Sequence, residues 1–254
     1  MSYLEAGPYA RRIPPELKTG AQHDPQAQSI GPLPRRAQAM STYAAWSAAL
    51  LTMGLVALYE IWFALAQRRR PDQLARSVHA TLRSEWFEAV SQQAGSEVLA
   101  VQTLRNSLMS ASMTASTAVL GFMGGITLSA SSLNTGFGAA AFQLTPRLAM
   151  ELVVLALLFA ALVSSVMAVR YYNHAGFVVA MPVGSPARQR WQAFGSDHLV
   201  RAGRLYSWSL RNLVLVAPPI AFILHPFAGP LAAALVVLVL FGFDRVRENV
   251  QAGI

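Results

Sequence analysis

Polar and small side chains recur at three- and four-residue steps between residues 102 and 121, a pattern that could line a path for an ion or a small solute. The residues are Gln102, Arg105, Asn106, Ser112, Ser116, Thr117 and Gly121. This spacing places them on one face of a helix. In a membrane, such a face must meet protein or water, because lipid offers polar groups no hydrogen-bond partners. The face could also be a packing surface, since small side chains let helices approach closely, and we favour this second interpretation.

A second candidate cluster follows the third apolar segment. It consists of five consecutive residues, Arg170, Tyr171, Tyr172, Asn173 and His174. His174 is the best single candidate for contact with a ligand, and together with Arg105 and Arg170 it could bind a lipid headgroup in a membrane enzyme. Polar aromatic residues beside an apolar segment are more typical of an anchor at the membrane surface, and we favour that interpretation.

Glu60 and Glu151 are the two carboxylates within the apolar segments. Glu60 is expected to form a structural ion pair with Arg105 or Arg170. Glu151 lies one turn after Arg147 at a predicted helix start, where a carboxylate also suits the helix dipole. The two carboxylates are expected at opposite faces of the membrane, so they cannot act as a catalytic or metal-bridging pair.

Arg105 and Arg211 each lie in a Leu-Arg-Asn triplet near the end of an apolar segment. The two side chains could clamp an anionic ligand. A long arginine side chain can also lie along lipid while its guanidinium reaches the phosphate layer. We expect this snorkelling arrangement for Arg211, whereas Arg105 shares the polar face with Gln102.

The sequence lacks the common motifs of metal-binding and catalytic sites. It contains five histidines and no cysteine. No His-x-x-x-His or Glu-x-x-His spacing occurs, and neither does a glycine-rich phosphate loop or a Gly-x-Ser-x-Gly turn. We therefore expect no catalytic activity, no cofactor and no metal site.

The composition indicates a membrane protein. Hydrophobic residues make up 54% of the 254 residues and charged residues only 13%, about half of the roughly 25% that is usual in soluble domains. A spanning helix needs about 20 mostly apolar residues. The expected spans cover residues 43–66, 98–130, 148–169, 208–224 and 229–243.

These segments predict an all-α fold, a polytopic membrane bundle of about five helices with the span over residues 98–130 at its centre. The last two spans should form a hairpin, because His225, Pro226, Gly229 and Pro230 interrupt the apolar run. The domain of spans covers residues 41–254. Residues 1–40 carry six prolines and few large aliphatic side chains, so we expect an extended tail that becomes ordered on a partner.

The distribution of basic residues predicts the orientation. Twelve arginines fall in the expected loops over residues 67–97 and 170–205 and in the C-terminal tail, against six Arg or Lys residues on the other side. The N-terminus should be outside and the C-terminus cytoplasmic. The Arg- and Ala-rich usage suggests the inner membrane of a bacterium. The basic loops are best explained by orientation and by membrane lipids, so no nucleic acid is expected as a partner.

Two stretches resemble the domain-of-unknown-function 599 family of small multi-pass membrane proteins. They are AVQTLRNSLMSASMTASTA at residues 100–118 and VRYYNHAGFVVAMP at residues 169–182. A third stretch, from Arg201 through Tyr206 and Trp208 to Arg211, is similar in pattern. The resemblance covers roughly residues 43–245 and implies an architecture, but no activity.

Three functions therefore stay open. The first is a non-catalytic accessory or scaffold subunit that packs against larger membrane protein subunits. The alternative is a pathway for a small solute or an ion, lined by the polar face of the second span. The third and weakest is an enzyme that acts on lipid headgroups through Arg105, Arg170 and His174.

Overall fold

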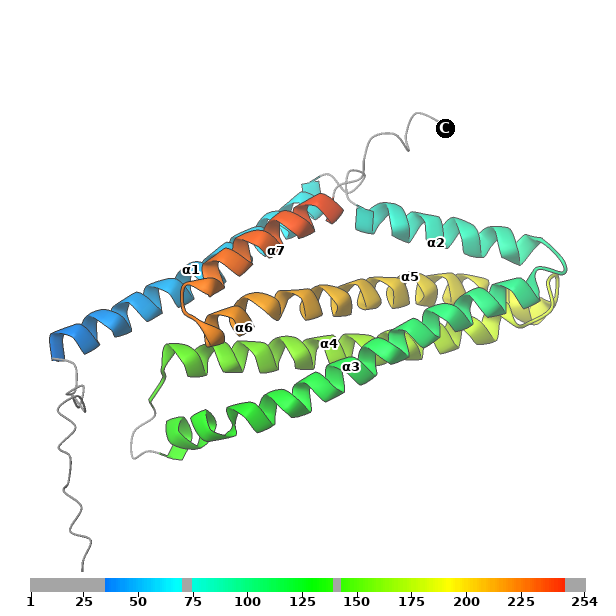
Figure 1. Ribbon diagram of the computed structural model, residues 1–254. Coiled ribbons are helices and arrows are strands. Elements are labelled where there is room, and N and C mark those ends of the chain that lie inside the picture. Colours follow the sequence, from blue (N-terminus) through cyan, green and yellow to red (C-terminus); the bar gives the residue numbers. More distant parts are fainter. Residues whose placement is uncertain (1–34, 70–74, 139–142, 245–254) are drawn as a thin grey trace, which may run out of the picture.

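The computed structural model describes residues 35–69, 75–138 and 143–244, with the side chains of 35–40 and of Arg76 left out of the description. All regular elements in these ranges are α-helices (Figure 1). They are α1 (Arg35–Arg69), α2 (Ala75–Gln92), α3 (Glu97–Gly138), α4 (Pro146–Val179), α5 (Pro186–Leu215), α6 (Ala217–Leu224) and α7 (Ala228–Asp244).

Four helical segments are long and apolar enough to cross a membrane. They cover Ser41–Arg69, Glu97–Gly138, Pro146–Val179 and Pro186–Leu224, and the shorter apolar helix α7 follows them. The 17 residues of α7 span about 25 Å at 1.5 Å per residue, close to the thickness of the hydrocarbon layer. The expected polytopic, all-α membrane bundle is confirmed.

Local sequence signals set the starts of α4 and α5. Thr145 and Ser185 each accept a hydrogen bond from the backbone N–H three residues later, and a proline follows each of them. This is the usual N-terminal arrangement of a hydroxyl cap and a proline that needs no hydrogen bond. Gly184, in the turn before α5, has a φ of 82° that other residues rarely adopt.

The expected final hairpin is present, but the span before its turn starts much earlier than predicted. The helix begins at Pro186 instead of Trp208 and is interrupted only at Val216, before Pro218 and Pro219. The chain then turns at residues 225–227 and returns as α7. Charged residues on α5 suggested a loop, yet most of the segment over residues 170–205 is helical.

The first helix also starts earlier than predicted, at Arg35. Residues 35–40, expected at the end of an extended tail, are therefore helical. The remaining expectations for the proline-rich tail fall on residues outside the described part of the chain.

Several helices extend well beyond α1 and α7, which lie side by side (Figure 1). The 42 residues of α3 span about 63 Å, twice the hydrocarbon thickness. Beyond the ends of α1 and α7, α2 packs along α5, and the first turns of α3 and the last turns of α4 complete a second bundle. We call this second bundle, residues 75–113, 166–179 and 186–207, the projecting bundle.

The projecting bundle has its own core of large and small apolar side chains. The fully or largely buried members are Phe87, Ala100, Leu104, Ala111, Ala168, Tyr172, Ala175, Val178, Val179, Leu199 and Ala202. These residues come from α2, α3, α4 and α5, so the bundle is held together by side chains that are far apart in the sequence. The interhelical loops expected over residues 67–97 and 170–205 are mostly parts of this bundle.

The central helix of the structure is α4, and the prediction that the second span is central is wrong. α4 contacts α1, α3, α5 and α6, whereas α3 is the least buried of the four candidate spans, with 11% of its most apolar stretch buried. α4 also packs closely on α5. At this contact the hydroxyls of Ser165 and Ser209 hydrogen-bond to each other, and Ser209 donates to the carbonyl of Ala161. Small residues in membrane helices allow such close contacts.

Candidate functional site

An arginine lies between two carboxylates where α1, α5 and α7 meet. Arg211 on α5 contacts Glu60 on α1, with Nε 2.8 Å from Oε1. Its Nη1 lies 2.7 Å from Oδ2 of Asp244, the last residue of α7. The same Asp244 oxygen accepts a 2.6 Å hydrogen bond from the hydroxyl of Tyr59. These residues, with Phe63, form what we call the Arg211 cluster.

The Arg211 side chain is only 6% exposed. Its guanidinium lies 4.2 Å from the ring centroid of Phe63 and 5.3 Å from that of Tyr59, in cation–π geometry. Nη2 is buried with no hydrogen-bond partner among the described residues. With all groups ionised, one positive charge faces two negative charges, so the attraction holds three helices together at one level.

Two expectations are corrected by this cluster. Glu60 forms the expected ion pair, but its partner is Arg211 and not Arg105 or Arg170. Arg211 does not snorkel to lipid phosphate, because two carboxylates inside the protein bind it. Asp244 was missed as a site residue. An acidic residue that directly follows the apolar run of α7 is the signal that could have identified it.

The Arg211 cluster also marks the boundary between the membrane and the projecting bundle. Asp244 ends α7 and Glu60 lies in the last third of α1, and a charged network of this kind is costly within hydrocarbon. On α4, the first charged residue after Glu151 is the exposed Arg170. We therefore place the hydrocarbon on the side of the cluster that contains α6 and the start of α4.

At the opposite end of the spans, Glu151 pairs with Arg147 as the helical spacing predicts. Arg147 Nε lies 2.9 Å from Glu151 Oε1, which also accepts a 3.3 Å hydrogen bond from Ser132. A pocket of about 260 Å³ opens beside this pair, and its lining residues include Ser131, Ser132, Thr135, Gln143 and Thr145. Glu60 and Glu151 thus lie at opposite ends of the spans.

The polar face of α3 points outward. Its exposed members are Gln102, Arg105, Asn106, Ser112, Ser116 and Thr117. The hydroxyls of Ser116 and Thr117 donate to backbone carbonyls one turn earlier, at 3.1 Å and 3.0 Å. Such internal bonds satisfy hydroxyl groups in lipid without a neighbour. Within the described chain, this face is therefore turned away from the other helices.

The small residues on the adjoining face of α3 contact α4. Ala111, Thr114 and Ala118 are buried there. A side chain at Gly121 would place its Cβ 3.2 Å from Leu158 Cδ2, whereas one at Gly124 would meet nothing within 4 Å. Gly121 therefore sits at the close approach of α3 and α4, although its own surface is largely exposed.

Replacing Gly121 with leucine should separate α3 from α4, because the added side chain collides with Leu158. We expect a lower yield of monodisperse protein in detergent and a lower melting temperature. The matched variants Gly124→Leu and Leu120→Ile should behave like the wild type, since both positions face outward. Equal tolerance of Gly121→Leu and Gly124→Leu would show that α3 does not pack on α4 at this point.

The five residues at 170–174 lie on α4 just beyond the Arg211 level. Tyr172 is buried in the core of the projecting bundle, whereas Arg170 and Asn173 are exposed. Tyr171 and His174 contact His198 of α5, with ring centroids 5.0 Å and 5.8 Å apart. Tyr171 and His174 thus pack against α5, and His198, expected in a loop, was missed as their neighbour.

Arg188 is a further buried arginine that the sequence did not reveal. Its side chain is 1% exposed. Nη1 donates to the carbonyls of Val179 and Met181 at 2.9 Å and 2.7 Å, and Nη2 donates to the carbonyl of Val90 at 3.1 Å. These carbonyls end α4 and α2, where a positive charge is favourable. Arg188 therefore links the ends of α2 and α4 to α5 at the far end of the projecting bundle.

Among the described residues, no group of three or more His, Asp or Glu side chains is placed to hold a metal ion. Residues 47–249 match the family described as "Protein of unknown function, DUF599". No curated protein and no solved structure matches the chain.

Proposed function

The chain belongs to the DUF599 family of proteins of unknown function, and we propose that it is a non-catalytic scaffold or accessory subunit of a larger membrane protein complex. The projecting bundle is the part that binds the partner. The proposal rests on one observation, the exposure of large apolar side chains at the end of that bundle farthest from the membrane.

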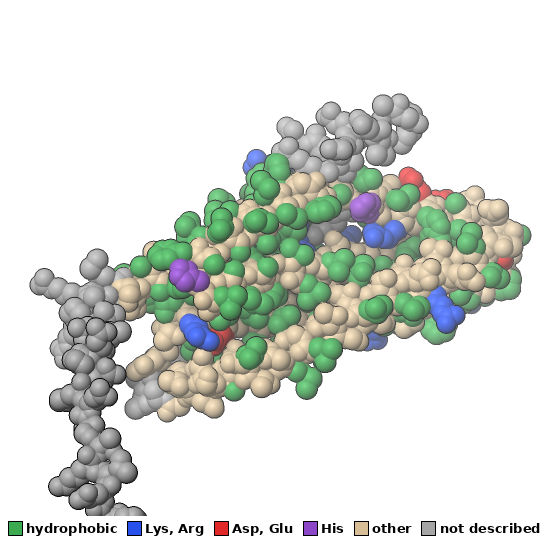
Figure 2. All heavy atoms as spheres, in the orientation of Figure 1, with side chains coloured by type: hydrophobic (Ala, Val, Ile, Leu, Met, Phe, Trp, Pro, Cys, Tyr) green, Lys and Arg blue, Asp and Glu red, His purple; other side chains and the backbone are tan. Residues whose placement is uncertain are grey.

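Three apolar side chains define what we call the distal patch. Val98, Leu99 and Phe177 are 70%, 68% and 69% exposed. Glu97 accepts a 3.0 Å hydrogen bond from the backbone N–H of Val183, which brings the start of α3 beside the end of α4. Figure 2 shows apolar side chains scattered among polar ones over the visible face of the molecule, with some at this end.

The distal patch lies too far from the spans to be covered by lipid. Gly121 on α3 lies beside Leu158 on α4. Two turns before Gly121, residues near 114 therefore lie at the level of Ser165, two turns after Leu158, and of Ser209, to which Ser165 is hydrogen-bonded. The 16 residues from there to Val98 extend about 24 Å beyond that level, and the headgroup layer is only about 5–8 Å thick. Apolar surface exposed to water at this distance is characteristic of a site for a protein partner.

We further propose that the projecting bundle is cytoplasmic and that the N-terminus is outside, in a bacterial inner membrane. The helices place Arg68, Arg69, Arg76, Arg83, Arg105, Arg170, Arg188, Arg190, Arg201 and Arg204 on the projecting side, against Arg35, Arg36 and Arg147 at the other end. An excess of arginine next to spans is typical of the cytoplasmic side.

The alternative function, a pathway for a solute or an ion, is supported by the exposed hydroxyls of α3. Because Ser112, Ser116 and Thr117 face outward, such a pathway would have to form between this chain and a neighbour. Gln102, Arg105 and Asn106 belong to the projecting bundle, where water can solvate them. The enzyme alternative has less support, since the ring of His174 contacts His198, and Arg105 and Arg170 are exposed.

One engineered cysteine tests both the partner and the orientation, because the natural chain has none. With Leu99→Cys, a membrane-impermeant maleimide should label the protein only after the inner membrane is opened. A short thiol-to-amine cross-linker should join the introduced thiol to one stoichiometric partner in native membranes. The control Leu128→Cys, on the spanning part of the same helix, should give neither product, because lipid surrounds it.

The partner must also depend on the distal patch. Native purification of a Val98→Ser, Leu99→Ser variant should lose the partner that the wild type retains. Gln102→Ala, which removes no large apolar side chain, should retain it. Purification of the wild type without a stoichiometric partner, or labelling of the Leu99→Cys variant in intact cells, would contradict the corresponding part of the proposal. Cross-links between two copies of α3 at Ser116 would favour the pathway instead.

A further inference from the structure

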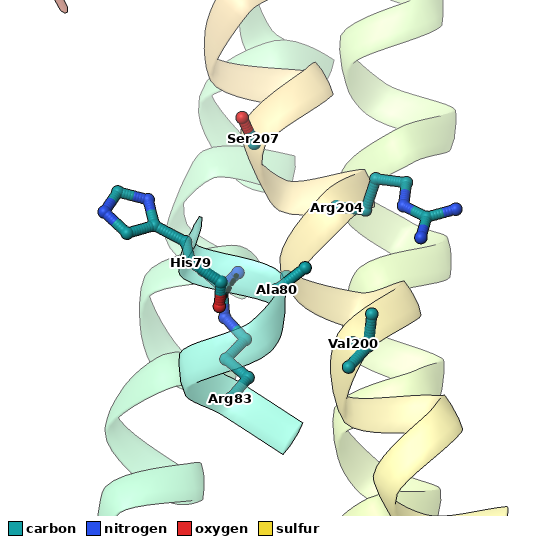
Figure 3. Close-up of a pocket in the computed structure, with 7 residues that line it drawn as sticks. His79, Ala80, Arg83, Val200, Arg204 and Ser207 are labelled. Carbon is teal, nitrogen blue, oxygen red and sulfur yellow. Dashed lines mark hydrogen bonds between the residues drawn. The ribbon is translucent and has the colours of Figure 1, made fainter. Parts of the chain in front are cut away.

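A small basic pocket lies between α2 and α5 (Figure 3). Its lining residues are His79, Ala80 and Arg83 of α2 and Val200, Gly203, Arg204 and Ser207 of α5. The pocket holds about 30 Å³, roughly the space of two water molecules, which suits the oxygen atoms of one anionic group. In Figure 3, Arg83 lies where α2 and α5 meet, whereas the His79 ring and the Arg204 guanidinium point away from each other on opposite sides.

Gly203 leaves room for the side chain of Arg83. A Cβ atom at Gly203 would lie 2.4 Å from both Cζ and Nε of Arg83, so the guanidinium rests directly on the bare backbone of α5. The one hydrogen bond that Arg83 makes to another described residue goes to the carbonyl of His79, at 3.3 Å. Most of the guanidinium N–H groups therefore stay free for a ligand.

The positive charges of the pocket lack partners within the described chain. Neither Arg83 nor Arg204 forms an ion pair with a described residue, and the hydroxyl of Ser207 makes no hydrogen bond to one. Arg201, one turn away on α5, is different because it pairs with Asp197 at 3.0 Å. The pocket thus gathers cations and a hydroxyl donor without a neutralising carboxylate.

The depth of the pocket matches that of lipid headgroups. Ser207 lies one turn and Gly203 lies two turns before Arg211 on α5. At 1.5 Å per residue these positions are about 6 Å and 12 Å beyond the Arg211 cluster. The headgroup layer of a bilayer occupies about the first 5–8 Å outside the hydrocarbon, so the Ser207 end of the pocket lies where phosphates are and the Gly203 end lies just beyond them.

We propose that this pocket binds the phosphate of an anionic membrane lipid. Arg83 donates to the phosphate oxygens from its place against Gly203, and Ser207 adds a hydroxyl donor, while the charge of Arg204 adds to the positive potential beside the pocket. Guanidinium groups bind phosphate through strong charge-assisted hydrogen bonds. This site is separate from the distal patch, so it does not depend on the scaffold function.

Lipid retention by the intact detergent-solubilised protein tests the proposal. Native mass spectrometry should detect bound phosphatidylglycerol but little phosphatidylcholine. Arg83→Gln should weaken the retention of phosphatidylglycerol about tenfold, the effect of losing one hydrogen bond between charged groups. Gly203→Ala should do the same, because its Cβ displaces the guanidinium without changing the net charge.

Arg201→Gln is the matched control, since it removes a charge of the same sign from an exposed position on the same helix. It should keep retention close to that of the wild type. An equal loss in Arg201→Gln and Arg83→Gln would mean that retention follows net charge and would overturn the site, as would unchanged retention in both Arg83→Gln and Gly203→Ala. Binding of inorganic phosphate that depends on Arg83, without retention of phosphatidylglycerol, would overturn the lipid as the ligand.

Discussion

Replacing Arg211 with methionine is expected to destabilise the protein more than any other single change considered, by about 3–5 kcal/mol. The variant leaves Glu60 and Asp244 facing each other without the guanidinium that now lies 2.8 Å and 2.7 Å from them. It also removes the cation–π contact with Phe63. The melting temperature of the monodisperse protein in detergent should fall sharply.

A triple variant separates charge from packing. Arg211→Met combined with Glu60→Gln and Asp244→Asn removes both unpaired carboxylates, so it should recover much of the lost stability. Arg201→Met breaks an ion pair whose two side chains are 55% and 65% exposed, and it should change little. If Arg211→Met alone melts like the wild type, the cluster does not hold α1, α5 and α7 together.

The second large effect is expected at Arg188, whose replacement with methionine should destabilise the projecting bundle by about 3 kcal/mol. The carbonyls of Val179, Met181 and Val90 would lose their donor in a buried place. Because these carbonyls end α2 and α4, the far end of the bundle should open while the spans stay intact. Hydrogen exchange should rise over residues 88–97 and 179–190.

The control for this variant lies two residues away. Arg190 is exposed on the same helix, so Arg190→Met should leave hydrogen exchange unchanged. A general rise in exchange that includes α1 and α7 would contradict the local role of Arg188. Retention of slow exchange in Arg188→Met would show that the three carbonyl contacts contribute little to the stability of the bundle.

Comparison of the two arginines shows where prediction from the sequence fails. Arg211 was expected to snorkel and Arg188 was expected in a loop, yet both are buried. The partners of Arg211 lie 151 and 33 positions away in the chain. No local pattern relates residues at such separations, so their pairing depends on how the helices pack.

Features that depend on short-range geometry and on composition could be predicted from the sequence. The apolar runs predicted the membrane helices, the proline and glycine residues predicted the final hairpin, and the four-residue spacing predicted the pairing of Arg147 with Glu151. The motifs at residues 100–118 and 169–182 indicated the family that the match over residues 47–249 confirms. Each of these signals is contained in a continuous stretch of chain.

The choice of the central helix and of the faces that stay open depends on how the helices pack in three dimensions. The polar face of α3 looked like an inner surface because lipid cannot satisfy polar groups. In the structure this face points outward. Its polar groups need no neighbouring helix, because Ser116 and Thr117 donate to carbonyls of their own helix and the residues around Gln102 lie in the projecting bundle. The projecting bundle escaped prediction for a related reason. In the sequence, its charged helices resemble loops between spans. Their helical structure depends on the burial of Phe87, Tyr172 and Leu199 in one core, and this burial requires several packed helices and is not a property of any single segment.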